Sequence, residues 1–165
     1  MLTAKNIRDG YVDFGNIDFI SEEDFNNCLI RCAPRENDVL IVSVGATTGR
    51  TAIVSLCEPF SIVRSVLLLR PLHQPRFLMR WLQSPWAQTW IQSASGSTAQ
   101  AHLYIRDTRT IPIPIPPEDE QKVILAEVER RLSVIEELEA TVEANLTRAA
   151  RLRQSILSQA FSGVL

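Results

Sequence analysis

The stretch "NDVLIVSVGATTGRTAIV", Asn37 to Val54, decides the fold of the N-terminal part of this chain. Two runs of β-branched and aliphatic residues flank a short segment that begins at Gly45 and ends at Gly49. A strand, a glycine turn and a second strand make a β-hairpin. We therefore predict paired strands over residues 38–44 and 51–54.

A phosphate-binding loop is the alternative interpretation of the same glycines. Such a loop needs four residues between its glycines, then a lysine and a helix. Here three residues separate Gly45 from Gly49, Arg50 follows, and the next residues are a β-branched run. Nucleotide hydrolysis at this turn is a weaker hypothesis, which would require measurable ATP binding.

Outward from the hairpin, the pattern first stays β-rich and then becomes helical. Residues 10–14 and 17–20 alternate as short strands do, and residues 61–69 continue the β-rich run. Apolar residues then recur at helical spacing in two pieces that open with Pro75 and Pro85, where a first-turn proline is tolerated. We predict two short helices, the second capped by Ser84.

Aromatic and polar residues in and after these helices leave two interpretations. Trp81, Trp86 and Trp90 could stack on bases, but at helical spacing among apolar residues they are more typical of a core. Residues 93–102 are small and polar, and fit either a plain loop or a set of adaptable donors to phosphates and base edges. Residues 111–116 alternate isoleucine with proline, which predicts an edge strand or an extended segment.

The C-terminal part predicts one long helix. Beyond Pro117 there is no proline, and no glycine before Gly163, and good helix formers dominate. Acidic residues follow Pro116 and Pro117, as is typical of a helix start. About 44 residues at 1.5 Å each would span roughly 66 Å. We therefore divide the chain into a domain over residues 1–116 and a helix over residues 117–165.

An apolar stripe runs along this helix. One series recurs every seven residues, and leucines lie three or four places after its members, as in a coiled coil. The stripe could pack on the chain's own domain, but a body of this size offers too little surface, so we expect another helix, from another chain or a second copy, to cover it. The helix-pairing residues are Val128, Leu132, Ile135, Leu138, Val142, Leu146, Ala149, Leu152 and Ile156.

Composition is that of a globular protein of 165 residues, with 45% hydrophobic and 22% charged residues. No apolar run approaches the roughly 20 residues that a bilayer requires, and no secretory signal is visible, so we expect a cytoplasmic protein without membrane contact.

The formal net charge is −2. Eleven basic against ten acidic residues give +1 for residues 1–116, and six against nine give −3 for the helix. Along the helix, acids precede bases, which suits its dipole.

No catalytic or metal-binding set stands out. Cys28, Cys32 and Cys57 are an odd number, which favours reduced thiols, and the spacing of the first two does not match a zinc site. The two histidines, His73 and His102, are distant in sequence, and no nucleophile motif surrounds any serine. These residues favour a binding protein over an enzyme, with no metal and no cofactor held by this chain.

Three stretches together resemble a known family. They are "NDVLIVSVGATTGRTAIV", "SASGSTAQAHLYIRDTRTIPIPIPPEDEQ" and "EVERRLSVIEELEATVEANLTRAARLRQSILSQAFSG". Their combination resembles the specificity (S) subunits of Type I restriction-modification systems. In that family, two target recognition domains each read half of a split DNA site, and two long helices pack antiparallel. The resemblance implies that methyltransferase (M) and restriction (R) subunits are partners, that S-adenosylmethionine is bound by the methyltransferase, and that this chain is non-catalytic.

The resemblance implies an α+β fold. We expect a mixed β-sheet target recognition domain with short helices, followed by one long C-terminal helix that pairs as an antiparallel coiled coil. The chain carries one recognition domain and one helix, and its opening "LTAKNIRDGYVDF" resembles the middle of such a domain, so we expect it to lack the family's first strands. A partial subunit would form a homodimer or pair with the helix of another S subunit.

The predicted function is recognition of a double-stranded DNA sequence for a restriction-modification complex. A structural helical dimerisation module without DNA binding is the alternative. Polar and basic residues near turns are the candidates for DNA contact. They are Lys5, Asn6 and Arg8 near the start, Thr47, Thr48 and Arg50 at the hairpin, and Ser95, Ser97, Thr98, Gln100 and His102 in the polar segment.

Overall fold

The computed structural model describes residues 1–55, 58–96 and 101–163. It divides into two compact units, Met1–Lys122 and Val123–Leu165, and each unit is described by itself.

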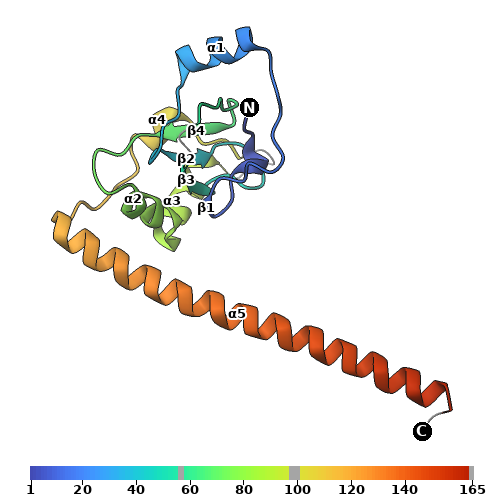
Figure 1. Ribbon diagram of the computed structural model, residues 1–165. Helices are drawn as coiled ribbons and strands as arrows, with labels where there is room; N and C mark the ends of the chain where they lie inside the picture. Colours follow the sequence, from blue (N-terminus) through green and yellow to red (C-terminus); the bar gives the residue numbers. More distant parts are fainter. Residues whose placement is uncertain (56–57, 97–100, 164–165) are drawn as a thin grey trace. The chain divides into compact units, whose positions relative to one another are not determined.

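The first unit is built on a four-stranded mixed sheet of order β1-β3-β2-β4 (Figure 1). The strands are β1 (Gly10–Tyr11), β2 (Val39–Val42), β3 (Thr51–Ile53) and β4 (Val66–Leu69). The hairpin prediction is confirmed, because β2 pairs antiparallel with β3 in the register Val39↔Ile53. On its other side β2 pairs antiparallel with β4, and β1 adds to β3 in parallel. The hairpin strand β2 is therefore fully buried at the centre of the sheet.

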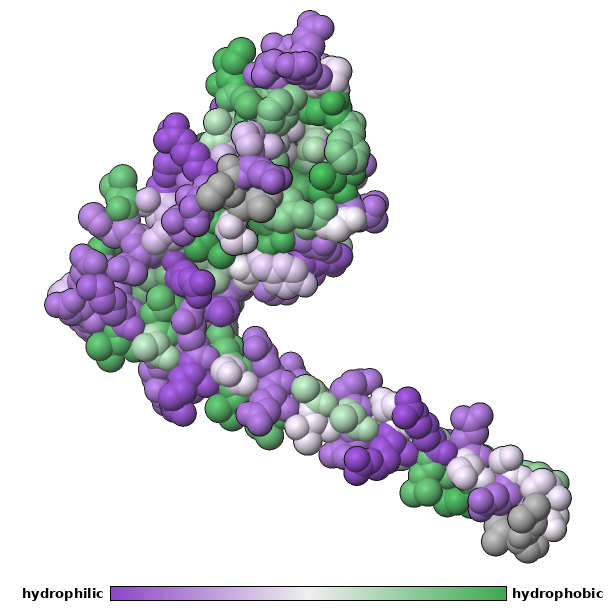
Figure 2. All heavy atoms as spheres, in the orientation of Figure 1, coloured by the Kyte–Doolittle hydropathy of each residue, from purple (hydrophilic) through white to green (hydrophobic). Residues whose placement is uncertain are grey.

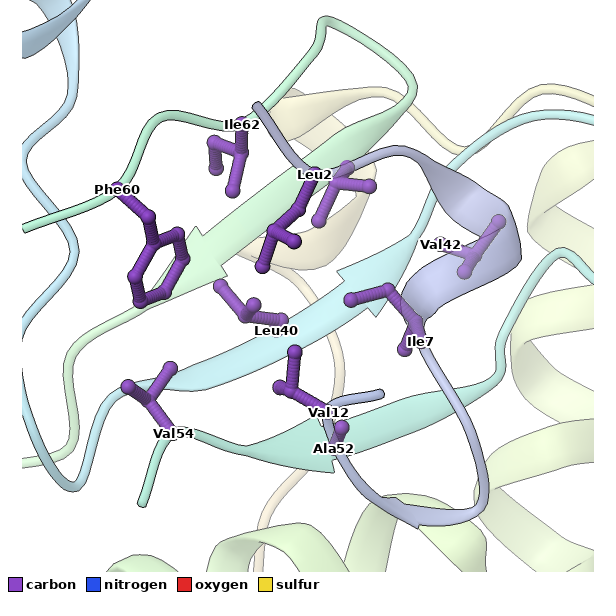
Figure 3. Close-up of a cluster of buried hydrophobic side chains, with 10 residues drawn as sticks. Leu2, Ile7, Val12, Leu40, Val42, Ala52, Val54, Phe60 and Ile62 are labelled. Carbon is purple, nitrogen blue, oxygen red and sulfur yellow. The ribbon is translucent and has the colours of Figure 1, made fainter. Parts of the chain in front are cut away.

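Alternate residues of the strands enter two separate hydrophobic clusters. On one face, Leu40 and Val42 meet Leu2 and Ile7 of the N-terminal segment (Figure 3). On the other face, Val39 and Ile41 pack with residues of the two helices that follow the sheet. Since both faces are covered, the strand residues alternate between two cores rather than between core and solvent.

The two short helices are confirmed as α2 (Pro75–Gln83) and α3 (Pro85–Ser95). Proline opens each helix, and the Ser84 hydroxyl accepts a hydrogen bond from the Ala87 amide, as a helix cap does. The interpretation of the tryptophans as core residues is wrong for Trp86, which is 50% exposed and lies against Trp81, with ring centroids 5.5 Å apart and planes tilted by 34°. Met79, Leu82 and Ile91 fill the buried face of this helix pair instead.

The N-terminal third differs most from the prediction. The expected strand over residues 10–14 is reduced to β1, and residues 17–20 form no strand. A 3-10 turn, η1 (Ala4–Asn6), and the helix α1 (Glu22–Arg31) were not predicted. The Ser21 hydroxyl accepts from the Asp24 amide and three acids occupy the first turn of α1, so local capping forms this helix although none of its residues is buried.

The segment that leads into the long helix is extended and not paired. A short helix, α4 (Ile105–Thr108), is followed by residues 111–116, which form no strand in the described structure. The alternating prolines remove the amide donors that a ladder would need. Of the two predicted options, the extended segment is the one observed.

The long helix is confirmed as α5, which runs from Glu118 to Phe161 over 44 residues. It begins directly after Pro117 with three acidic residues, and Gly163, just beyond its end, has φ +74°, as is typical of a helix-terminating glycine. Along its surface, hydrophobic residues are interspersed with hydrophilic ones (Figure 2). In the part of the chain that the structure describes, no helix is both long and apolar enough to span a bilayer.

Candidate nucleic-acid interface

The hairpin turn is hydrogen-bonded to the end of the polar segment and to Leu103, which follows it. The Leu103 amide donates to the Ser43 carbonyl at 2.8 Å, and the Gly45 amide donates to the Ala101 carbonyl at 3.3 Å. Val44 and His102 form an isolated bridge between these bonds. The structure therefore brings the candidates at the turn and His102, which are 52 to 55 residues apart in sequence, to one end of the sheet.

The turn itself is held by its own hydrogen bonds. The Thr48 hydroxyl donates to the Gly45 carbonyl at 2.7 Å, and the Arg50 amide donates to the Thr47 carbonyl at 3.0 Å. Thr47, Thr48 and Arg50 are partly exposed. These side chains are thus presented to solvent on a backbone that is already ordered.

Of the N-terminal candidates, Arg8 lies close to this turn, because β1 runs alongside β3 and the neighbouring Asp9 contacts Arg50. Arg50 forms an ion pair with Asp9, Nε to Oδ2 at 3.7 Å, and Arg8 forms one with Asp13 at 3.3 Å. The Gly15 amide and the Arg8 guanidinium both hydrogen-bond the Asp13 carboxylate and lower its pKa below the ordinary value. The two arginines are therefore partly neutralised by neighbouring carboxylates. Lys5 is exposed.

Two residues that the sequence predicted as DNA contacts are buried in the fold. Asn6 is 4% exposed, and its amide nitrogen donates to the carbonyls of Asp13 and Asn16. Its carbonyl oxygen accepts from the amide of Thr3. Ser95 is also buried, and its hydroxyl donates to the Ile91 carbonyl at 2.6 Å. We assign Asn6 and Ser95 structural roles, because their polar side-chain groups are used within the fold.

Of the remaining candidates in the polar segment, Ser97, Thr98 and Gln100 lie outside the described residues. His102 lies inside them and is partly exposed.

Two residues that the sequence analysis did not name stand next to His102. The Tyr104 ring stacks on the His102 ring, with centroids 4.1 Å apart and planes 20° apart. The guanidinium carbon of Arg106 lies 4.9 Å from the centroid of the Tyr104 ring. The sequence does contain a signal for this cluster, because His, Tyr and Arg occur at every second position. The Ile-Pro repeat that follows is the more conspicuous pattern.

A separate apolar groove of about 1170 Å³ follows the outer edge of β4. Aliphatic side chains of β4, α2 and residues 111–115 line most of it, and Arg64 and Arg109 are also among its lining residues. Because most of the lining is apolar, hydrophobic contact is the main chemistry that this groove offers. Within residues 1–55, 58–96 and 101–163, no group of three or more His, Cys, Asp or Glu side chains is placed to hold a metal ion.

The apolar stripe of α5 is exposed over most of its length. Ile135, Leu138, Val142, Leu146, Leu152 and Ile156 are each 48% to 61% exposed. Val134, Leu157 and Phe161, which were not in the predicted set, are exposed as well. Large aliphatic side chains in such a row are typical of a surface that another helix covers.

Comparison with known proteins gives concordant matches. Residues 6–148 match the family model described as the Type I restriction modification DNA specificity domain. The chain is 36% identical, over its whole length, to the EcoBI Type I restriction enzyme specificity subunit of Escherichia coli, and 25% identical to the EcoKI specificity subunit of strain K12. It spans 35% and 37% of the length of these two relatives.

Two solved structures are similar in fold. One comes from work on complex assembly and conformational transition of the type I R-M system, with a TM-score of 0.59 and 28% identity over 78% of this chain and 31% of the other. The second is the type IIG restriction endonuclease BpuSI, with a TM-score of 0.50 and 16% identity over 68% of this chain and 14% of the other, which shows likeness of fold alone.

Proposed function

Because the chain belongs to the Type I restriction modification DNA specificity domain family, we propose that it recognises a double-stranded DNA sequence as the specificity component of a restriction-modification complex. The observation that carries this proposal is the family match over residues 6–148, which includes nearly all of the first unit. A purely structural helical module is less favoured, because the match is to a DNA specificity domain and is not confined to the helix.

The geometry supports DNA contact at the hairpin end of the sheet. Thr47, Thr48 and Arg50 lie on an ordered turn, and the bridge to His102 adds a second segment to the same surface. Hydroxyl and guanidinium groups on turns are the donors that proteins most often direct to DNA phosphates and sugars. Lys5 and Arg8 extend this surface along the N-terminal segment.

The experiment is DNA binding by the whole chain as a function of salt. A duplex that the protein selects from a random library is labelled, and its affinity is measured from 50 to 200 mM salt beside an unrelated duplex. A protein that makes several phosphate contacts loses affinity steeply over this range. An affinity that does not change with salt, or no enrichment of any duplex, would sink the DNA proposal.

We also propose that α5 pairs antiparallel with the same helix of a second copy. Acidic residues end at Glu143 and the last basic residues are Arg148, Arg151 and Arg153, so antiparallel pairing brings unlike charges together, whereas parallel pairing aligns like charges. A two-fold axis between Asn145 and Leu146 places Ile135 opposite Ile156 of the second copy. The same register places Val142 opposite Ala149, and Glu143 opposite Arg148.

Cysteine cross-linking tests this register. In a chain whose native cysteines are changed to serine, we expect Ile135→Cys and Ile156→Cys chains to form a disulfide only when the two are mixed. Parallel pairing would instead join each variant to itself. Absence of any cross-link at both positions, with the fold intact, would contradict the pairing.

The wider complex follows from the family. We propose that methyltransferase and restriction subunits are the protein partners, and that this chain contributes recognition while they contribute catalysis. As the family resemblance implies, S-adenosylmethionine, the methyl donor, would be bound by the methyltransferase partner. We propose a cytoplasmic location for this complex, since its DNA target would lie there.

A further inference from the structure

His102, Tyr104 and Arg106 form a stacked column on the first unit. Of these three residues, only His102 belongs to the binding surface that was predicted from the sequence. The His102 and Tyr104 rings are parallel to within 20°, and the Arg106 guanidinium lies over the Tyr104 ring. Tyr104 is 47% exposed, and the Arg106 side chain is 81% exposed. The Tyr104 ring, with its hydroxyl, and the positively charged Arg106 guanidinium therefore reach solvent side by side.

The backbone beneath this column is fixed from both sides. Leu103 is fully buried, and its amide donates to the Ser43 carbonyl at 2.8 Å. The Tyr104 amide donates to the Asp107 carboxylate at 3.2 Å, and the Tyr104 carbonyl accepts from the Asp107 amide at 3.0 Å. The column is thus anchored to the hairpin on one side and to α4 on the other.

Stacking also restrains the arginine. An exposed arginine ordinarily loses much rotamer freedom when it binds, and a guanidinium already held over an aromatic ring loses less. The opposing carboxylate of Asp107 is 3.4 Å from Arg106 Nε and leaves the terminal nitrogens of the guanidinium outside that contact. These nitrogens and the Tyr104 hydroxyl are hydrogen-bond donors, from which an anionic oxygen group can accept.

Resting on the DNA-binding function proposed above, we infer that Tyr104 and Arg106 clamp a single phosphate of the DNA backbone, with His102 as the support of the Tyr104 ring. The clamp lies next to the hairpin turn, because the Val44↔His102 bridge joins the two segments. A contact to phosphate fixes the position of the protein on the duplex and carries no sequence information of its own. Tyr104 and Arg106 are therefore positioning contacts for readout by the neighbouring loops.

The test measures affinity and salt dependence for the selected duplex and for an unrelated duplex. We expect Arg106→Gln to weaken binding to both duplexes about tenfold and by the same factor, and to lower the slope of log affinity against log salt by about 1. Arg106→Lys should keep the salt slope, because the charge remains. Tyr104→Phe, which keeps the stack and removes the hydroxyl, should weaken both complexes about threefold.

Arg35→Gln is the matched control, since it removes one positive charge just before β2, at the end of that strand away from the turn. Circular dichroism and thermal midpoints of all variants confirm folding. If Arg106→Gln binds both duplexes as Arg35→Gln does, the clamp is overturned while the proposed function stands. If affinity falls for the selected duplex alone, a base contact replaces the phosphate contact and the inference is wrong. If the unaltered chain shows no salt-sensitive binding, the proposed function fails and the clamp fails with it.

Discussion

Arg70 forms a bidentate ion pair with the buried carboxylate of Asp38. Its Nε lies 2.9 Å from Oδ1 and its Nη2 lies 2.8 Å from Oδ2, while the Asp38 side chain is 3% exposed. The hydrogen bond to Asp38 raises the pKa of Arg70, so the guanidinium stays charged. Asp38 directly precedes β2 and Arg70 directly follows β4. The pair therefore closes the end of the sheet opposite the candidate DNA surface.

Arg70→Ala should lower the free energy of unfolding by about 3 kcal/mol, because it leaves a buried carboxylate without its counter-charge. Urea unfolding followed by circular dichroism measures this. Arg64→Ala, which removes an exposed arginine from the other end of β4, is the control and should cost less than about 0.5 kcal/mol. Equal costs for the two variants would show that the Asp38 pair contributes no more than a surface residue.

Gly49→Ala should destabilise the hairpin more than Gly45→Ala. Both glycines have positive φ, +92° and +96°, so alanine strains the backbone at either site. At Gly49, an added Cβ would also lie 2.8 Å from Oε1 of Gln88 and 3.2 Å from Cγ2 of Ile91, whereas at Gly45 it would meet open space. Thermal unfolding should show a cost of about 1 kcal/mol at Gly45 and a larger one at Gly49. Equal costs would mean that Gln88 moves aside freely.

The hairpin, the two proline-initiated helices and the long helix could be predicted from the sequence because each depends on local signals. Alternation around Gly45 and Gly49 defines β2 and β3, and Ser84 and Pro117 mark helix starts that need no tertiary information. The α+β class agrees with these elements, but it was implied by the family resemblance.

The N-terminal segment and part of the site could not be predicted, since they depend on contacts between distant residues. Asn6 is polar in sequence, but its amide is satisfied by carbonyls seven and ten residues away, which buries it. The His102–Tyr104 stack lies next to a bridge between Val44 and His102, and no local pattern encodes that bridge, although the alternation of His, Tyr and Arg is visible in the sequence. Pairing of α5 and DNA contact at Arg50 stay predictions.

Arg50→Ala should weaken DNA binding about tenfold and lower the salt slope by about 1, as loss of one phosphate contact does. Asp9→Asn should have the opposite effect, because the Asp9 carboxylate lies 3.7 Å from Arg50 Nε and competes with phosphate for it. Fluorescence anisotropy with a labelled duplex measures both. If Arg50→Ala leaves affinity unchanged, Arg50 is part of a turn and not of an interface.

The Glu127 carboxylate should titrate far below its ordinary range. Hydrogen bonds from Arg130, and then from Arg131, lower the pKa of Glu127 to about 2. Since the folded value is depressed, the contribution of Glu127 to helix stability is present in full above pH 4.5 and is lost as the pH falls toward 2. Carboxyl chemical shifts recorded by NMR against pH measure this value. Combined Arg130→Gln and Arg131→Gln changes should return the pKa of Glu127 toward 4.5, and an unchanged pKa would exclude both arginines as its cause.

Self-association should depend on the stripe of α5 and not on its opposite side. Ile135 and Val142 are 48% and 57% exposed, and each would be buried against the second helix in the proposed pair. Ile135→Glu and Val142→Glu place a carboxylate in that seam, where burial without a counter-charge is costly, so we expect each change to reduce the sedimentation mass to that of a single chain. Ala140→Glu adds the same charge to the same helix five residues beyond Ile135, on the side away from the stripe, and should leave the mass unchanged. Helix content measured by circular dichroism separates loss of pairing from loss of folding. If all three variants keep the mass of the unaltered chain, the stripe does not mediate association, and the antiparallel pair is wrong.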